Sequence, residues 1–393
     1  MKRVLAGIAA GFLLFPQAAF AQAAAPSAVG VVRETLPNGM RIVLLPSKLA
    51  PVATTVITYG VGSDDDTIPG IAHATEHMLF RGTKNVTAGQ FAIMATRAGA
   101  DYNASTHETY TNYYFKLPSA YVGIALRLEA DRMTGALERE ADWKTERGAI
   151  EQEVRAHESV PGASVFAKMR RAFFGATPYA QDGVGTIAGF ERMKAADIAR
   201  FYHTWYHPNN ATLVVSGDID PVKTMAEIHR DFGSIAQGDL PQRKSFTITS
   251  LDAATMHDTF AELPLPVSAG AYRFPSLNSP DLAAGEVLAA VLNSPRAAIA
   301  DLQVKGQLLA AISVHGAYPQ TGIMMIMGLG FPGTAPETAQ SNIESALTQY
   351  RTSGVPPELV EAAKTRLLSE QDYREASISG MAFTWANSLA IGQ

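Results

Sequence analysis

The sequence predicts an α+β protein with two domains. Its 393 residues exceed the length of one ordinary domain, and length alone favours two. A polar, turn-rich stretch at residues 236–244 has the composition of a linker between them. On both sides of this stretch, short β-branched and apolar runs alternate with longer segments in which apolar residues recur at helical spacing.

The first half is expected to begin with two strands and a short helix. Val, Ile, Thr and Tyr dominate the second of these strands, and such side chains favour a pleated, half-buried surface. The helix follows a Pro-Gly turn and continues without Gly or Pro until Gly82. The expected elements are strands at 39–45 and 52–59, a helix at 71–80, a strand at 109–117 and an amphipathic helix at 121–133.

The second half is expected to repeat this plan in a shorter form. It has no counterpart of the Tyr-x-Pro-x-Asn-Ala segment near the end of the first half, and the chain stops within a helix-like segment at 381–389. We therefore expect the second domain to be incomplete at its C-terminus. The expected elements are a helix at 281–292, strands at 309–314 and 322–329, and helices at 335–352 and 357–369.

The N-terminus has the pattern of a secretory signal peptide. Lys2 and Arg3 precede an apolar stretch at 4–15, and the Ala-Phe-Ala at 19–21 is a typical cleavage site. We expect a signal peptide at 1–21 and a periplasmic mature protein. No later stretch reaches the ~20 apolar residues of a membrane anchor. The absence of cysteine excludes disulfides and thiolate metal sites, and a diffuse net charge of −5 argues against nucleic acid as a partner.

His73, Glu76 and His77 are the residues most indicative of function. Positions i, i+3 and i+4 are neighbours on a helix, so both imidazoles can bind one metal ion with the carboxylate beside them. The order His-x-x-Glu-His is the inverse of the commoner zinc-protease motif. A catalytic zinc site needs a third protein ligand and a position for water. The alternative is a helix with two surface histidines and a capping or ion-pairing glutamate.

Four segments resemble the pitrilysin/insulinase-type metallopeptidases, in particular the branch of the mitochondrial processing peptidase and its bacterial relatives. They resemble the zinc helix, the edge strand, the helix with the last ligand and the strand that closes the first domain, at residues 70–83, 99–106, 146–153 and 206–218. The resemblance implies two homologous α/β-sandwich domains. The zinc-bearing domain would lie at 30–240 and the second domain at 245–393.

The third ligand has to be chosen among Glu146, Glu151 and Glu153. In the family the ligand lies two helical turns after the Glu of a Glu-Arg pair, which selects Glu153. The resemblance makes Glu146 a further carboxylate of the catalytic site that orients a ligand or water. For Glu151 and Glu158 we favour a solvated helix face, because charged side chains are mostly exposed.

The implied chemistry is peptide hydrolysis with one zinc ion per chain. Zinc lowers the pKa of its bound water towards about 7 and polarises the scissile carbonyl. Glu76 is expected to act as the general base on this zinc-bound water and to pass the proton to the leaving amine. By resemblance, Asn103 and Ala104 lie on the edge strand, where a peptide substrate pairs by strand addition. For Asn103 a plain turn role is an equally favoured alternative.

A partner subunit is expected because of a segment in the second half. Active family members complete the site with an Arg and a Tyr from a Leu-Arg-x-x-x-Gly-Leu-Ala-Tyr segment. The equivalent residues here are 302–310, and Gln303 and Ala310 occupy the Arg and Tyr positions. We therefore expect a heterodimer with a homologous subunit that lacks the zinc motif and supplies the Arg/Tyr pair.

Two other functions are compatible with the sequence. The chain could be a catalytically silent structural or assembly subunit of the same fold, although the intact motif and Glu153 argue against this. It could also be a peptide-binding module without turnover.

His203 and His207 repeat the i, i+4 spacing of the histidines in the motif. Pro208 ends their helix, however, so we expect two surface histidines rather than a second metal site.

Overall fold

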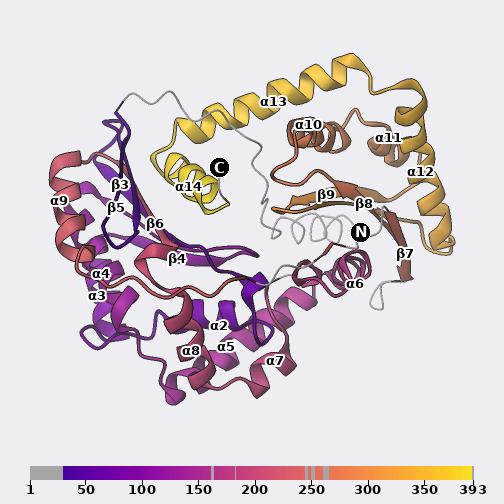
Figure 1. Ribbon diagram of the computed structural model, residues 1–393. Coiled ribbons are helices and arrows are strands. Elements are labelled where there is room, and N and C mark those ends of the chain that lie inside the picture. The colour runs from indigo at the N-terminus through magenta and orange to yellow at the C-terminus, as the bar shows by residue number, and fades with distance from the viewer. Residues whose placement is uncertain are drawn as a thin grey trace. The chain divides into compact units, whose positions relative to one another are not determined.

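The computed structural model divides into two compact units (Figure 1). The first unit contains the described residues of 30–155, 183–243 and 372–391, and the second unit contains those of 156–181 and 247–371. The expected signal peptide at 1–21 lies outside the described residues. The structure describes residues 30–160, 163–181, 183–243, 247–248, 253–259 and 265–391, with the main chain alone for 254–259.

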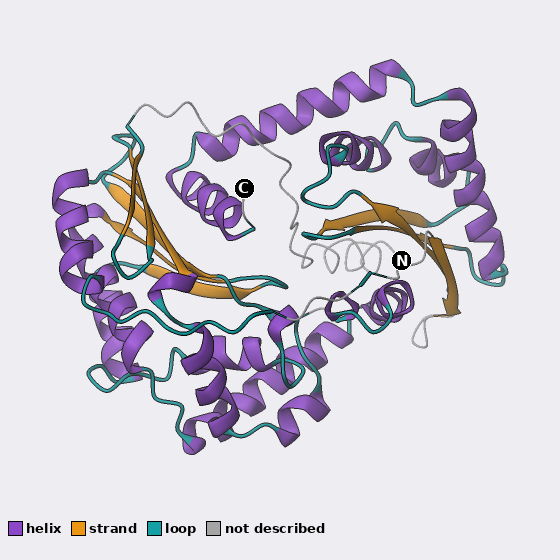
Figure 2. Ribbon diagram, in the orientation of Figure 1, coloured by secondary structure: helices purple, strands orange, loops and turns teal. Residues whose placement is uncertain are grey.

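The first unit is built on a six-stranded sheet (Figure 2). β2 and β6 run parallel, and the other neighbouring strands are antiparallel. β6 is buried along its whole length because it lies between β2 and β3, whereas β4 forms an edge of the sheet. The strand order is β1 (Val32–Thr35), β2 (Arg41–Pro46), β6 (Ala211–Gly217), β3 (Val52–Tyr59), β5 (Thr111–Pro118) and β4 (Asp101–Thr106).

Helices cover one face of this sheet and enclose the largest apolar core of the unit. Leu44, Ile57 and Leu213 of the sheet belong to the same buried cluster as Ile71 of α2 and Leu126 of α4. α2 packs against α8 as well as against β4. The helices are α2 (Ile71–Met78), α3 (Ala88–Arg97), α4 (Val122–Gly135), α5 (Glu140–Glu158), α7 (Ile187–Arg192), α8 (Ala195–Trp205) and α9 (Pro221–Phe232).

Helix α14 (Ile378–Ala390) covers the opposite face of the same sheet, from the far end of the sequence (Figure 1). Two side-chain hydrogen bonds of 2.9 Å supplement the apolar contact, one between Thr54 and Ser379 and one from Asn112 to Asn387. Helix α14 therefore belongs to the first unit, although it follows the second unit in the sequence. The buried apolar cluster between this helix and the sheet consists of Val43, Leu45, Val56, Val214, Ala382, Trp385 and Ala386.

The second unit contains a four-stranded antiparallel sheet. α6 packs its apolar side chains on one face of this sheet, against alternate residues of β8 and β10. α12 lies on the other face, where Gln340 accepts a hydrogen bond from Ser268. The elements are β7 (Ala253–Thr259), β8 (Pro266–Phe274), β10 (Gly322–Leu329), β9 (Ala310–Ala317), α6 (Ala163–Phe174), α10 (Leu282–Leu292), α11 (Ala298–Val304), α12 (Pro336–Ser353) and α13 (Pro357–Glu375).

The helices and strands expected from the sequence are present, with ends shifted by a few residues. The α+β class is confirmed, and so is the presence of two domains. The two compact units, however, are not continuous in sequence, because α6 packs in the second unit and α14 in the first. The assignment of these two helices to the units depends on contacts between residues far apart in the sequence, and the local periodicity of apolar residues does not show such contacts.

Trp385→Ala should destabilise the protein by roughly 3–5 kcal/mol, since it removes a buried aromatic side chain from the interface between α14 and the sheet. The wild-type ring is 6% exposed, and the Arg33 guanidinium lies 4.5 Å from its centroid. Urea unfolding followed by circular dichroism measures the change. Leu368→Ala, at a position on α13 that is 62% exposed, is the control and should cost less than ~0.5 kcal/mol. Equal effects would contradict the packing of α14.

Candidate metal centre

Helix α2 begins where the Asp66 carboxylate binds its first turn. This carboxylate accepts hydrogen bonds from the backbone N–H groups of Gly70 (2.6 Å) and Ala72 (3.0 Å). Gly70 has a φ of 89°, which favours glycine, and it turns the chain into the helix. Burial raises the pKa of Asp66 to about 7, although both N–H groups favour the ionised form. These contacts fix the start of the helix that carries His73 and His77.

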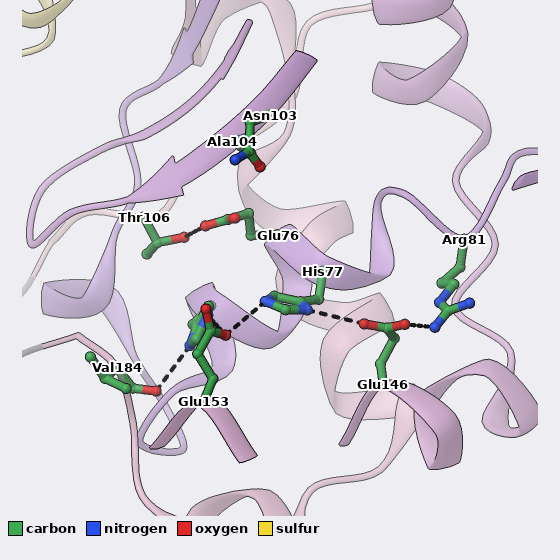
Figure 3. Close-up of polar contacts among 10 residues, drawn as sticks. Glu76, His77, Arg81, Asn103, Ala104, Thr106, Glu146, Glu153 and Val184 are labelled. Atoms are coloured by element: carbon green, nitrogen blue, oxygen red, sulfur yellow. Dashed lines mark hydrogen bonds and ion pairs between the residues drawn. The ribbon is translucent and has the colours of Figure 1, made fainter. Parts of the chain in front are cut away.

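The structure brings His73, His77 and Glu153 together. The Nε2 atoms of both histidines lie 3.4 Å from Oε2 of Glu153, which α5 supplies. Figure 3 shows the Glu153 carboxylate directed toward His77. One ligand atom of each residue lies within 4.8 Å of the others, and the described part of the chain contains no second group of this kind.

This donor set fits a zinc ion. Zinc binds imidazole nitrogen and carboxylate oxygen, and catalytic sites use three protein ligands with one open position. Hydrogen bonds from His73 and His77 hold the pKa of Glu153 well below its usual range, so this carboxylate is anionic. Burial alone would lower the pKa of His73, but its hydrogen bond with Glu153 and the charge of Glu76 raise it. Two imidazoles facing one anion form a suitable environment for a divalent cation.

Each histidine makes a further contact through Nδ1. His73 Nδ1 lies 3.0 Å from the carbonyl oxygen of Val184, and His77 Nδ1 lies 3.0 Å from Oε2 of Glu146. A carbonyl oxygen can only accept, so His73 donates from Nδ1 and, when neutral, keeps its lone pair on Nε2. Nε2 is the atom that faces Glu153. Carbonyl and carboxylate partners of this kind are typical of metal-binding histidines.

Glu76 lies on the same helix but contacts the sheet. Its side chain is 8% exposed, and its Oε2 accepts a hydrogen bond of 2.6 Å from the Thr106 hydroxyl at the end of β4 (Figure 3). This bond fixes the orientation of the carboxylate, whose charge raises the pKa of His73 on the same helix. Glu146 is also buried and approaches His77 from α5 on the Nδ1 side.

Asn103 and Ala104 lie in the middle of the edge strand β4. Asn103 is opposite Tyr114 in the register with β5, so the plain turn role considered for it is wrong. The N–H of Ala104 donates to Oδ1 of Asn103 at 2.9 Å, and it is therefore directed at this side chain rather than at β5. The side chain of Asn103 is exposed.

Two other candidate positions lie outside the three-residue group. The Glu151 carboxylate is 3.7 Å from Arg147 and 3.2 Å from Arg155. Its side chain is 17% exposed, so it is less solvated than the exposed helix face expected for it, and its two arginine partners account for its charge. His203 is exposed, and its carbonyl oxygen is 2.8 Å from Nε2 of His207.

Three residues of the site were not expected from the sequence. Arg81 forms an ion pair with Glu146 (Figure 3). Its spacing of four residues from His77 is a helical signal, although α2 ends before it. Thr106 ends the expected edge strand and shares a strand face with Ala104, so strand alternation could have identified it. Val184 contributes only a main-chain carbonyl, for which the sequence has no signal.

Two segments of the chain match known protein families. Residues 42–186 match the family described as Insulinase (Peptidase family M16), and residues 192–367 match the Peptidase M16 inactive domain. The chain belongs to peptidase family M16. The pitrilysin/insulinase-type resemblance of the four sequence segments is thereby confirmed, and all residues of the metal centre fall within the first match.

Similar proteins of this family are named zinc proteases. An uncharacterised zinc protease of Streptomyces coelicolor is 32% identical over 207 residues, which are 52% of this chain and 45% of the relative. The zinc protease PqqE of Helicobacter pylori is 26% identical over 330 residues, which are 81% of this chain and 74% of the relative. The chain thus spans less than half of the first relative and about three quarters of the second.

The fold is shared with solved structures. The crystal structure of a protease from Helicobacter pylori superposes with a TM-score of 0.85, over 92% of this chain and 90% of that chain, at 24% identity. Within the described residues of the M16 chain, none of the helices has both the length and the apolar character needed to span a membrane.

Proposed function

We propose that this chain is a zinc-dependent endopeptidase subunit that hydrolyses peptides or unfolded segments. The observation that carries the proposal is the convergence of His73, His77 and Glu153 from two helices. Glu76 lies on the same helix as both histidines, and its charge acts on His73. Membership of family M16 and the zinc-protease names of its relatives support it. The three converging residues would hold one zinc ion per chain.

In the proposed reaction, the protein side chains orient the reactants and move a proton. Held by His73, His77 and Glu153, a zinc ion would act as a Lewis acid that lowers the pKa of water and polarises the scissile carbonyl. Glu76 takes a proton from the attacking water and returns it to the leaving amine. Its hydrogen bond from Thr106 occupies Oε2, which leaves Oε1 for the proton. Glu146 acts on the site by holding His77 through Nδ1.

The substrate is proposed to add as an extended strand along β4. An edge strand has main-chain groups that can pair with a peptide, and such pairing gives affinity with little sequence preference. The Ala104 N–H donates a hydrogen bond to the Asn103 side chain. In the proposed complex, a carbonyl group of the substrate would accept this hydrogen bond instead. The released Asn103 amide would then be free to contact the substrate.

We also propose that a homologous subunit without the zinc motif completes the site. Gln303, at the end of α11, and Ala310, at the start of β9, occupy the positions where active family members carry Arg and Tyr. Neither side chain supplies a cation or a phenol. Donors aimed at a developing oxyanion are each worth about 10²–10³ in rate, so the isolated chain should be nearly inactive.

The proposed location is the periplasm, after removal of a signal peptide at 1–21. In this scheme catalysis belongs to a zinc-bearing domain at 30–240, followed by a second homologous domain at 245–393. A donor set of imidazole and carboxylate contains no thiol to oxidise, so it is compatible with an oxidising compartment.

The alternative functions are a catalytically silent subunit of the same fold and a peptide-binding module. An enzyme is favoured because neither alternative requires a buried Glu76 with a fixed carboxylate beside three converging ligands. Peptide cleavage that stops on chelation would distinguish the enzyme from both alternatives.

Glu153→Gln should weaken zinc binding because a neutral amide replaces an anionic ligand. Glu76→Gln should instead keep zinc and lose about 10²–10⁴-fold in turnover, the usual contribution of a general base. Zinc content by mass spectrometry and cleavage of a fluorogenic peptide, with and without chelator, measure both. Glu151→Gln is the matched control on the same helix and should change neither. Loss of zinc from Glu76→Gln, with zinc and activity kept by Glu153→Gln, would reverse the two roles.

Extended peptides should be cut and compact folded proteins spared, because only an extended chain can pair with β4 along its main chain. Digestion of one protein in its native and its unfolded state, followed by mass spectrometry, tests this. Efficient cleavage within a regular helix of the native protein would count against strand addition.

The purified chain should show little activity alone and gain about 10²-fold or more when a homologous subunit with the Arg/Tyr pair is added. Size-exclusion chromatography and peptide cleavage across a titration of the second subunit measure this. Full activity of the chain as a monomer or homodimer would exclude the heterodimer.

A further inference from the structure

Arg81 is linked to the metal centre through Glu146, which contacts both Arg81 and His77. It lies in the turn after α2, where its N–H donates to the carbonyl oxygen of Met78 at 2.9 Å. Its carbonyl oxygen accepts a hydrogen bond of 3.2 Å from Arg139, so the main chain at this point is held from both sides. Its guanidinium pairs with Oε1 of Glu146, while Oε2 of the same carboxylate contacts Nδ1 of His77 (Figure 3).

We propose that Arg81 is a positioning residue that sets the metal-binding form of His77 through Glu146. The inference rests on the proposed zinc site and goes beyond it, because Arg81 itself neither binds the metal nor contacts the substrate. It assigns to Arg81 a contribution to zinc affinity.

The first step of the argument concerns the two oxygens of Glu146. The side chain is 9% exposed, so its oxygens depend on protein partners rather than on water. The guanidinium of Arg81, a permanent cation, pairs with Oε1. This pairing holds the carboxylate with its other oxygen, Oε2, at Nδ1 of His77.

The second step concerns the proton on His77. An anionic carboxylate at 3.0 Å from Nδ1 accepts a hydrogen bond from the ring, so Nδ1 carries the hydrogen. In the neutral imidazole the lone pair then lies on Nε2, the atom that faces Glu153. Arg81 therefore favours the tautomer that can bind a metal together with Glu153.

The two histidines differ in what holds them. His73 donates to the main-chain carbonyl of Val184, an acceptor that cannot gain a proton or lose its place without moving the backbone. His77 depends on two side chains in series, Glu146 and Arg81. Loss of the outer side chain should therefore affect one ligand of the site and spare the other.

The proposal predicts a change in zinc affinity opposite to the change expected from charge alone. Removing a positive charge near a dication should strengthen metal binding if charge alone matters. Removing a positioning residue should weaken it, because contacts of this kind typically contribute 10–100-fold to metal affinity. The direction of the change in zinc affinity therefore decides between the two effects.

The experiment measures the zinc dissociation constant of the full chain by competition with a chromophoric chelator. Arg81→Leu should weaken binding 10–100-fold. Arg81→Lys, which keeps the charge but loses the planar guanidinium, should lie between this variant and the wild type. Arg200→Leu removes an exposed arginine that pairs with Asp197 on α8, and as the matched control it should leave the affinity unchanged. Thermal unfolding without metal checks that each variant is folded.

A double-mutant cycle tests whether Arg81 acts through Glu146. Glu146→Ala should weaken zinc binding, and adding Arg81→Leu to it should have less than about a twofold further effect, because the contact that Arg81 supports is already lost. In zinc-loaded protein labelled with 15N-histidine, the downfield Nδ1–H signal of His77 should broaden in Arg81→Leu, and that of His73 should persist.

Each outcome bears on the proposal. Unchanged or tighter zinc binding in a folded Arg81→Leu protein would overturn it, and so would independent effects of the two substitutions. If the wild type binds no zinc, the proposed function fails, and the inference with it. If the wild type binds zinc and the Arg81 variants match it, only the inference fails.

Discussion

The site depends on one long-range encounter, in which an anionic carboxylate on α5 meets two imidazoles on α2. α5 is docked by a stripe of residues three or four positions apart, among which Trp143 and Ile150 are fully buried. Trp143 also donates from Nε1 to the carbonyl oxygen of Met193 at 2.9 Å. Glu146 and Glu153 follow the same spacing, so the packing that fixes α5 also presents both carboxylates to the site.

The charged side chains near α2 are paired with one another. The buried Glu146 is shared between Arg81 and His77, and Glu153, whose side chain is 56% exposed, faces both histidines. A buried ion pair is weak evidence for stability, since desolvation offsets most of its attraction. Its contribution here is geometric, because each partner restricts where the next side chain can lie. As a result, the Nε2 atoms of both imidazoles face the same carboxylate oxygen.

Part of this arrangement could be predicted from the sequence. The helical spacing of His73, Glu76 and His77 is a local property, and it is present in α2 as expected. Glu153 could be chosen over Glu151 only through a family resemblance, because spacing alone does not show which face of a helix meets another helix. The carbonyl of Val184 and the packing of α14 arise from contacts between distant segments, which no local pattern records.

In the proposed mechanism, the edge strand β4 would connect substrate binding with the general base Glu76. β4 pairs on one side with β5, and its last residue, Thr106, fixes the carboxylate of Glu76. A peptide that added to the free side of β4 would therefore be aligned by the same strand that orients the base. The register of the peptide would then determine which of its carbonyl groups approaches the metal centre. Under the proposed binding mode, a preference for an extended backbone would follow from this shared element, and side-chain preference would come only from the surroundings of the scissile bond.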